Sequence, residues 1–492
     1  MEIDRNRSAR DWVKEKKYLL RPAIILSIIY IIAISAIIRA DVLYLDDVWR
    51  AMEGTKGWDF FSRYLSNFLS VFIHAENYLT DVSPMPQILA ALIMGITSAL
   101  ALSILTGREE FSVWDYIAVL PLGLSPYFLE CFSYRYDAPY MAVSVFFSVA
   151  PLIFANTSIY AFCLATVLGT LGMCTTYQAS SGIFPMMMIA LLFRQWTQGE
   201  EKGRLIRLAA SSAGSYGAAL LFFRIFLMHY VDDYVSVAIS RNGFLSYVLR
   251  NYKDYYTAVV LDFRKEWLAL ICLILLLFVV YETVRSRRNR FATAIIALLS
   301  LFSLLLLAFG VYPFLKAPLF APRAMYGIGA LVAVAAVIAC DGKHPWLARL
   351  SCLALSWSFF VFAFTYGNAL SVQEEYSRFR MESVISDLTD IPEFSEAESV
   401  CLQLEGSIGY APQIRHYPQN YRMLRDLVPI TFQDSWRWGE YTFYNVYDLW
   451  NVHTDSDTDL TKENLVLLKE SIYHTIYGDE NNFLVVLKDP EN

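Results

Sequence analysis

The chain has 492 residues, of which 56% are hydrophobic and 18% charged, and its mean hydropathy is +0.39. A soluble globular chain is about 25% charged, so this composition excludes an ordinary soluble protein and indicates a chain that lies mostly in lipid. The formal net charge is −7, and we expect no nucleic-acid partner. The seven cysteines lie mostly in apolar runs without metal-site spacing, so we interpret them as small buried hydrophobes.

A hydropathy window of about 19 residues predicts about eleven membrane-spanning helices. They lie near 20–39, 85–106, 113–130, 138–156, 158–175, 180–195, 208–228, 266–282, 291–311, 324–340 and 350–367. Residues 58–80 are too often interrupted by polar groups to span, and their aromatic and aliphatic spacing predicts helices that lie in the interface. The expected fold class is therefore an all-α polytopic membrane protein with interfacial helices.

Basic residues predict the orientation of these spans. If the N-terminus is cytoplasmic, every short basic loop lies on the cytoplasmic side. These residues are Arg5, Arg7, Arg10, Lys14, Lys16, Lys17, Arg108, Arg194, Lys202, Arg204, Arg285, Arg287, Arg288, Arg290, Lys343 and Arg349. The first outer loop, 40–84, and the segment from residue 368 onward then lie on the opposite side.

The segment after the last span predicts a separate domain, so we divide the chain into a membrane domain, 1–367, and a C-terminal domain, 368–492. Residues 371–492 carry 22 Asp or Glu against 9 Lys or Arg, a net charge of −13. Gln373 to Leu388 has helical spacing. Short strands are expected at Val400 to Leu404, Ile472 to Tyr477 and Phe483 to Leu487. This pattern predicts a small, acidic α/β domain in water.

Two adjacent carboxylates, Asp46 and Asp47, follow the first span, with Arg50 three residues beyond the second of them. Adjacent acids repel each other, so one of the two can have a raised pKa and accept a proton. The alternative is that one of them caps a short interfacial helix, since Asp is a favoured N-cap residue.

A second charged segment lies between the third and fourth spans and contains Glu130, Arg135 and Asp137. Charges at a membrane mouth are costly unless they are paired or used. Arg135 could pair with either acid. The alternative is that its planar guanidinium binds a phosphate at the level of the lipid headgroups.

Further polar residues are expected on the same outer side at the ends of other spans: Tyr177, Gln178, Lys316 and Arg323. Each has a simpler explanation, as a member of an interfacial aromatic belt or as a snorkelling cation. Their convergence with the two acidic segments, however, predicts a site for an anionic lipid and a group to be transferred. A second double acid, Asp232-Asp233, lies in an aromatic-rich outer loop that could contact an acceptor or simply anchor a helix end.

Several of these motifs resemble those of the bacterial serotype-converting, O-antigen-modifying glucosyltransferases of type II. This family is part of the GT-C superfamily of polyprenyl-phosphate-sugar-dependent enzymes. The motifs are Tyr44-Leu-Asp46-Asp47-Val-Trp-Arg50, Pro126 to Glu130 continuing into Ser133-Tyr-Arg135-Tyr-Asp137, Tyr177-Gln178, Pro322-Arg323 and Tyr366 to Leu370. The resemblance implies a GT-C-like fold in the bacterial inner membrane, with the C-terminal domain in the periplasm.

The resemblance also implies a reaction: transfer of a sugar, expected from the family to be glucose, from undecaprenyl phosphate to an O-antigen or another surface glycan, with inversion at the anomeric carbon. Asp46 or Asp47 would be the general base. Arg135, with Arg323 or Lys316, would stabilise the departing phosphate, and Arg50, Glu130, Asp137, Tyr177 and Gln178 would contact substrate. No cofactor is certain, although two acids could hold Mg²⁺ or Mn²⁺.

Other classes of membrane protein remain as alternatives. A transporter of lipid-linked glycans would show charged or broken helices near mid-membrane and an internal repeat, and neither is evident. A polysaccharide polymerase or membrane acyltransferase handles related substrates. An acyltransferase would need a catalytic histidine near a carboxylate, and His74 is the histidine that falls in the first outer loop.

Overall fold

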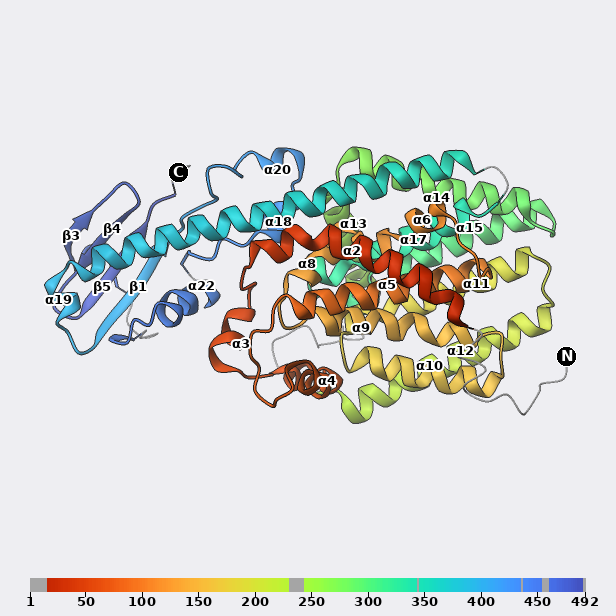
Figure 1. Ribbon diagram of the computed structural model, residues 1–492, viewed down its shortest axis with the longest axis horizontal. Coiled ribbons are helices and arrows are strands. Elements are labelled where there is room, and N and C mark those ends of the chain that lie inside the picture. The colour runs from red at the N-terminus through yellow and green to blue at the C-terminus, as the bar shows by residue number, and fades with distance from the viewer. Residues whose placement is uncertain (1–15, 230–242, 343–344, 435–436, 454–459, 490–492) are drawn as a thin grey trace. The chain divides into compact units, whose positions relative to one another are not determined.

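The computed structural model describes residues 16–229, 243–342, 345–434, 437–453 and 460–489 (Figure 1). The chain forms two compact units, each discontinuous in sequence. The first comprises residues 1–38, 56–78 and 82–365, and the second comprises 39–55, 79–81 and 366–492. Residues 39–55, from the predicted first outer loop, therefore group with the C-terminal segment.

The first unit is built from helices. Its longer elements are α2 (Leu20–Ala40), α4 (Tyr64–His74), α5 (Met85–Thr106), α9 (Ala138–Val149), α10 (Ile159–Cys174), α11 (Ile183–Thr197), α12 (Lys202–Phe222), α13 (Phe244–Asp262), α14 (Lys265–Arg285), α15 (Arg290–Leu307), α17 (Gly327–Cys340) and the first part of α18 (Trp346–Thr389). Short helices connect them: η1 (Lys16–Leu19), η2 (Trp58–Phe61), α6 (Val113–Val119), α7 (Pro121–Leu124), α8 (Pro126–Ser133), η3 (Ala150–Phe154), η4 (Gln178–Gly182), η5 (Phe223–Leu227), η6 (Tyr312–Phe314) and α16 (Pro322–Met325).

Several of these helices are long and apolar enough to cross a membrane, which supports the prediction of a multi-pass protein. Within the described residues there are six, or up to seven if the bent pair Val113–Leu124 and Pro126–Ser133 forms one span. Three more apolar helices, Ala138–Phe154, Ile159–Cys174 and Gly327–Cys340, are shorter. The predicted number of about eleven spans is therefore not confirmed.

Helix α17 illustrates why hydropathy alone predicts more membrane spans than there are helices of sufficient length among the described residues. All of its 14 residues are buried inside the protein. At 1.5 Å per residue it is about 21 Å long, shorter than the roughly 30 Å hydrocarbon core of a bilayer. A helix surrounded by protein and a helix surrounded by lipid are equally apolar in sequence, so the hydropathy window cannot distinguish them.

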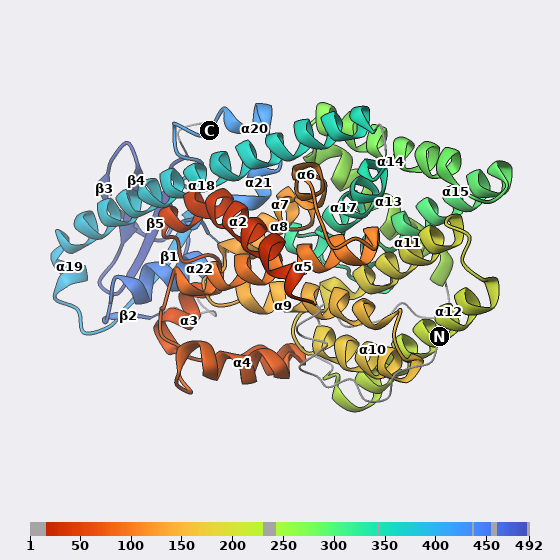
Figure 2. The same ribbon diagram turned by 45° about the vertical axis from the view of Figure 1, so that its right-hand side comes forward.

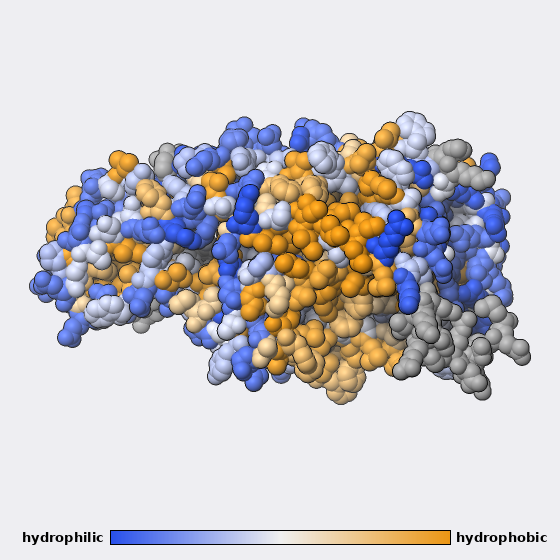
Figure 3. All heavy atoms as spheres, viewed as in Figure 1, coloured by the Kyte–Doolittle hydropathy of each residue, from blue (hydrophilic) through white to orange (hydrophobic). Residues whose placement is uncertain are grey.

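The surface of the first unit is apolar where soluble proteins are polar. Figure 3 shows a continuous hydrophobic patch over its helices on the face drawn. Helix α4, in the segment predicted to lie in the interface, has the same inverted pattern: Phe68 and Phe72 are exposed, whereas Ser66 and Ser70 are buried. An exposed aromatic face on such a helix suits contact with lipid.

Small residues allow α2 and α5 to approach closely, as is common between membrane helices. Gly95 of α5 lies against Ser27 of α2, where an added Cβ would be 2.1 Å from Ser27 Oγ and 2.8 Å from its Cα. Nearby, the Tyr30 hydroxyl is 2.9 Å from Ser98 Oγ. Close backbone packing and a buried hydroxyl pair thus hold the first span against the second.

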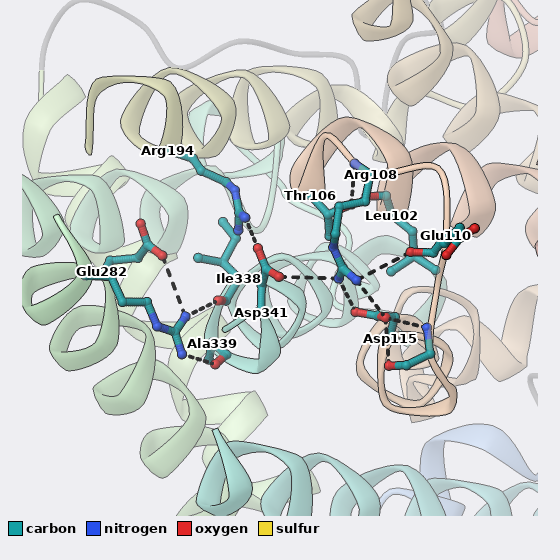
Figure 4. A network of polar contacts seen from close by, with 12 residues as sticks. Leu102, Thr106, Arg108, Glu110, Asp115, Arg194, Glu282, Ile338, Ala339 and Asp341 are labelled. Carbon is teal, nitrogen blue, oxygen red and sulfur yellow. Dashed lines mark hydrogen bonds and ion pairs between the residues drawn. The ribbon is translucent and has the colours of Figure 1, made fainter. Parts of the chain in front are cut away.

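A network of six charged side chains joins the ends of several helices in the first unit (Figure 4). It consists of Arg108, Asp115, Arg194, Glu282, Arg285 and Asp341. Asp341 accepts from Arg194 and lies 3.4 Å from Arg108 Nη2, while Arg285 donates to the carbonyl of Ile338, in the last turn of α17, at 3.3 Å. Three loops predicted to be basic and to share one side of the membrane therefore meet.

The second unit contains a five-stranded sheet, which confirms the predicted small C-terminal sheet. Its strands are β1 (Val400–Gly406), β2 (Val452–His453), β3 (Val466–Glu470), β4 (His474–Gly478) and β5 (Asn482–Leu487), in the order β2-β1-β5-β4-β3. Strand β1 is parallel to β2 and β5, and β4 is antiparallel to β5 and β3. The remaining elements are α3 (Asp47–Glu53), α19 (Pro392–Ser395), α20 (Tyr417–Asn420), α21 (Leu424–Leu427), α22 (Arg437–Tyr441) and η7 (Thr442–Val446).

The C-terminal part of α18 runs along this sheet (Figure 2). Met381, Val384 and Leu388 of α18 form one buried core with residues of β1 and β5, including Leu402 and Val485. The predicted helix from Gln373 to Leu388 is present, but it is continuous with the predicted last span. Gly367 and Asn368, residue types that often end a helix, lie between the two and are helical here, and no proline interrupts residues 346–389.

The close contact of α2 with α5 makes a testable prediction about Gly95. We expect Gly95→Ala to destabilise the protein by about 1–3 kcal/mol, because the new methyl group overpacks a helix contact. Gly214→Ala is the matched control, since nothing lies within 4 Å of a Cβ there, and it should be neutral or stabilise by about 0.5–1 kcal/mol through helix propensity. Thermal unfolding of the purified protein in detergent measures both, and equal melting temperatures would contradict the packing.

Candidate functional site

A sharp bend between α7 and α8 positions Glu130, a predicted site residue of the first unit. Pro126 is the first residue of α8, and the residue before a proline is disfavoured in the helical conformation. Ser125 accordingly has ψ of 136°, and the helices on either side of it meet at an angle of 59°. The bend sends α8 in a new direction, and Glu130 lies on α8.

Glu130 forms a buried ion pair with Arg323. The Glu130 side chain is 2% exposed and that of Arg323 is 20% exposed, so the acid is the more deeply buried partner. The carboxylate accepts two hydrogen bonds from the same residue, one from Arg323 Nη1 at 2.6 Å and one from the Arg323 backbone nitrogen at 2.5 Å. The pair joins α8 to α16, which are separated by 193 residues in sequence.

The surroundings of Arg323 stabilise its protonated, positively charged form. Burial by itself lowers the pKa of this guanidinium, but Tyr134 and Glu130 raise it, and the net direction is upward. The guanidinium also lies 5.7 Å from the centre of the Tyr134 ring. Arg323 is thus a charged group whose countercharge comes from Glu130, which favours a structural role over a direct phosphate contact.

Asp137 and Arg135 are both buried, beside the same region of α8 and α9. Asp137 Oδ1 accepts a hydrogen bond from the indole Nε1 of Trp58. Trp58 is itself fully buried and lies edge-on to Tyr140, with ring centres 4.8 Å apart. This contact holds η2 against the start of α9. The role of Arg135, as a partner of an acid or as a phosphate ligand, stays a prediction.

Tyr177 and Gln178 contact the segment around η2. The Arg63 guanidinium lies 4.6 Å from the centre of the Tyr177 ring, and the opposite neighbour of Tyr177 is Tyr326, stacked at 6.3 Å. Gln178 Nε2 donates to the carbonyl of Phe61 at 3.0 Å. Both predicted residues therefore contact the segment that carries Arg63, a residue for which the sequence predicted no functional role.

A pocket of about 330 Å³ opens beside these residues, entirely within the first unit. Gln178, Arg63 and Tyr312 line it together with mostly apolar side chains from η5 and the 311–319 segment. Its volume is in the range of small-molecule sites. The pocket is the strongest candidate for ligand binding among the described residues.

The first-loop residues Asp46, Asp47 and Arg50 lie in the second unit, so we describe them separately. Asp46 precedes α3 but makes no side-chain capping bond; instead it pairs with Arg50, 3.2 Å away. Its side chain is 34% exposed, whereas Asp47 is fully buried and accepts a hydrogen bond from the Tyr44 nitrogen at 3.2 Å. The two acids thus have different environments, and Asp46 is the one that solvent reaches.

The C-terminal segment holds this loop in place within the second unit. The Tyr44 hydroxyl donates to the carbonyl of Leu427 at 2.9 Å, and Tyr441 donates to Glu53 at 3.0 Å. Burial and the bond to Glu53 raise the pKa of Tyr441 to about 12, so it remains a donor at neutral pH. Leu45, directly before Asp46, has φ of +53°, a strained conformation for leucine that typically needs surrounding structure to hold it.

The remaining predicted residues are less informative. Lys316 is exposed. His74 is buried at the end of α4 and stacks on Tyr136, with ring centres 5.8 Å apart. Asp232 and Asp233 lie outside the described residues. The predicted convergence of the first loop with the residues of the first unit stays a prediction.

The described part of the chain contains no group of three or more His, Cys, Asp or Glu side chains that could hold a metal ion. Asp46 and Asp47 are the two acids that were considered as Mg²⁺ or Mn²⁺ ligands. The Asp47 carboxylate is buried and bonded to the backbone of its own loop, so the pair does not present two open carboxylates.

Comparisons with known proteins give one family and one relative. The family described as Glucosyl transferase GtrII matches residues 35–334. A Salmonella phage P22 protein, described as an uncharacterized 55.3 kDa protein in the gtrB 5′ region, is 22% identical over 416 residues, covering 81% of this chain and 84% of its own length. No solved structure matches the chain. The predicted GT-C-like fold therefore stays a prediction.

The buried ion pair makes a prediction about stability. Arg323→Gln should destabilise the protein by roughly 3–5 kcal/mol, because it removes the cationic partner of the buried Glu130 carboxylate, whereas Glu130→Gln should cost less because Arg323 is partly exposed. The double variant, which removes both charges, should recover much of this loss. Thermal unfolding in detergent, with a double-mutant cycle, measures the coupling.

The exposed pair Arg250–Asp254, with side chains 70% and 47% exposed, is the control. Arg250→Gln should change stability by at most about 1 kcal/mol. Single variants of Glu130 and Arg323 that are as mild as this control would show that the pair is not a structural link.

Proposed function

Because the chain belongs to the Glucosyl transferase GtrII family, we propose that it transfers a sugar, glucose in the family's description, from undecaprenyl phosphate to a surface glycan. The observation that carries this proposal is the extent of the family match. Residues 35–334 include the first loop with Asp46 and the whole buried cluster as far as Arg323. The matched region is therefore the one that contains every predicted site residue.

The lipid-linked donor is the finer part of the proposal. Its support is physical: the chain is a multi-pass membrane protein, and its described pocket is mostly apolar with cationic side chains in its wall. A sugar carried on a polyprenyl phosphate would present its phosphate at the membrane surface and its chain to apolar protein. A lipid-linked or polymeric glycan is the proposed acceptor.

In the proposed reaction Asp46 is the general base. The acceptor hydroxyl gives its proton to the Asp46 carboxylate while its oxygen forms a bond to the anomeric carbon. The bond from that carbon to the phosphate oxygen breaks, and its electron pair leaves with the lipid phosphate. A single displacement of this kind inverts the anomeric configuration. We assign the base to Asp46 because Asp47 is buried.

Cations would stabilise the negative charge that forms on the departing phosphate. Arg135 and Lys316 remain candidates for this role. Arg323 is a weaker candidate, since its charge is already balanced by Glu130. We propose that the Glu130–Arg323 pair instead fixes the relative positions of α8 and α16, so that other groups can bind substrate.

The proposed role of the C-terminal unit is to position the first loop. Hydrogen bonds from Tyr44 to Leu427 and from Tyr441 to Glu53 lie within that unit. They support a tail that holds the segment around Asp46 in one conformation.

The first test is a transfer assay. Purified protein with undecaprenyl-phosphate-linked [¹⁴C]glucose and lipopolysaccharide should yield labelled glycan, whereas UDP-[¹⁴C]glucose should not. Asp46→Asn should lower the rate about 10²- to 10⁴-fold without loss of stability, because the amide keeps the shape but accepts no proton. Asp47→Asn should instead lower the melting temperature.

The second double acid supplies the control for that assay. Asp232→Asn should transfer at a nearly normal rate. If Asp46→Asn also does so, the assignment of the base is wrong, and if wild-type protein transfers only from UDP-glucose, the lipid-linked donor is wrong.

A separate prediction concerns orientation in the bacterial inner membrane. We propose a cytoplasmic N-terminus and a periplasmic C-terminal unit, supported by the meeting of the basic loops at Arg108, Arg194 and Arg285. Protease added to intact spheroplasts should then remove an epitope tag placed after Asn492. An epitope that resists digestion until the cells are lysed would reverse the orientation.

A further inference from the structure

The pocket in the first unit has an apolar interior. Its walls include Phe61, Cys174, Phe223, Met228 and Leu319. Cys174 and Phe223 also belong to a buried hydrophobic cluster with Met173, so this part of the wall is packed against other apolar side chains. An interior of this kind suits an aliphatic chain and offers little to a free sugar.

Arg63 brings a positive charge to this pocket without a matching acid. Among the described residues no carboxylate forms an ion pair with its guanidinium, and its Nε atom is buried without a hydrogen-bond partner. The guanidinium lies 4.6 Å from the Tyr177 ring centre and 5.1 Å from that of Phe61. Two aromatic rings orient the cation but leave its N–H donors available to an anion.

A second arginine, Arg224, also lines the pocket. It lies on η5, a π-helical turn at the end of the span Lys202–Leu227, between the exposed apolar residues Phe222 and Ile225. An arginine in an apolar span is costly and usually functional, and π-helical turns are frequent at functional sites. Two cations on separate elements thus face one apolar pocket.

This combination identifies the ligand by its chemistry. An apolar cavity can bind an aliphatic chain. A guanidinium without a countercharge can bind a phosphate, because its planar array of N–H donors matches two phosphate oxygens. A neutral lipid would leave the Arg63 guanidinium without a countercharge, and a free phosphate would leave the apolar part of the cavity unfilled. A single aliphatic chain that ends in a phosphate satisfies both parts.

We propose that this pocket binds the phosphate and the adjoining isoprenyl units of the lipid carrier, with Arg63 as the principal phosphate ligand and Arg224 as the second. The assignment rests on the proposed function for the identity of the carrier. It places the phosphate-binding role on two residues outside the predicted site, and it explains why Tyr177 and Gln178 matter: they hold the segment that carries Arg63.

The test is a binding measurement that does not depend on transfer. Purified full-length protein in detergent is titrated with farnesyl phosphate, farnesol and inorganic phosphate, and intrinsic tryptophan fluorescence or calorimetry gives each Kd. Farnesyl phosphate should bind more tightly than either of the other two. Arg63→Gln should weaken its binding about 10- to 100-fold, the loss expected for a charge-assisted hydrogen bond, and Arg63→Lys should lose part of this affinity.

Two further variants distinguish the contribution of the apolar cavity to binding from that of the Arg63 charge. Leu319→Trp should reduce the advantage of farnesyl phosphate over inorganic phosphate, because a larger side chain fills the apolar part of the pocket. Arg250→Gln, at an exposed arginine outside the pocket, is the control and should bind normally. Melting temperatures of all variants exclude unfolding as the cause of a loss.

Each outcome decides a different point. Unchanged farnesyl phosphate binding by Arg63→Gln and Leu319→Trp overturns the pocket assignment, even if the protein transfers glucose. Tight, Arg63-dependent binding by a protein that transfers no sugar supports the pocket and overturns the proposed function. Equal competition by phosphatidic acid in mixed micelles would show a general phospholipid site and would also overturn the assignment to a carrier.

Discussion

The buried pairing of Glu130 with Arg323 is the constraint on which the organisation of the first unit depends. Two opposite charges in an apolar interior are stable only while each has the other, and the loss of one partner is far more costly than the loss of both. The pair therefore fixes α8 against α16 and removes Arg323 from the list of cations that can act freely on a substrate. A site that needs positive charge must find it elsewhere, and Arg63 lines the pocket with a buried Nε atom that has no hydrogen-bond partner.

Much of the fold could be predicted from the sequence because lipid and protein interior both select apolar runs. Each predicted span contains a helix, and the two strands expected at Ile472 to Tyr477 and Phe483 to Leu487 are present as an antiparallel pair. The number of spans could not be predicted, since α17 is apolar through burial in protein rather than through contact with lipid. The last predicted span and the first helix of the tail form one helix, α18, which continues through Gly367 and Asn368 although these residue types often end a helix.

The sequence was sufficient to predict which types of residue belong to the candidate site, but it predicted only some of the contacts between them. Glu130 and Arg323 were both predicted, yet the alternative considered for Glu130 was Arg135, five residues away, and not a residue 193 positions along the chain. Arg63 received no role, although an arginine between Phe61 and Tyr64 in an apolar segment was a signal that could have been used. The difference between Asp46 and Asp47 also required the structure, since burial of one of two adjacent acids depends on the packing of α3.

We propose that the carrier phosphate binds to Arg63, while Arg323 remains in its ion pair with Glu130. A cryo-EM structure of the protein with a non-hydrolysable C-glycoside analogue of undecaprenyl-phosphate glucose tests this claim most directly. We expect phosphate density within about 3 Å of the Arg63 guanidinium, the typical length of such a hydrogen bond, with the lipid chain passing between Phe223 and Leu319 and the Glu130–Arg323 pair intact. Phosphate density against Arg323, with Glu130 displaced and the pocket beside Arg63 empty, would contradict it.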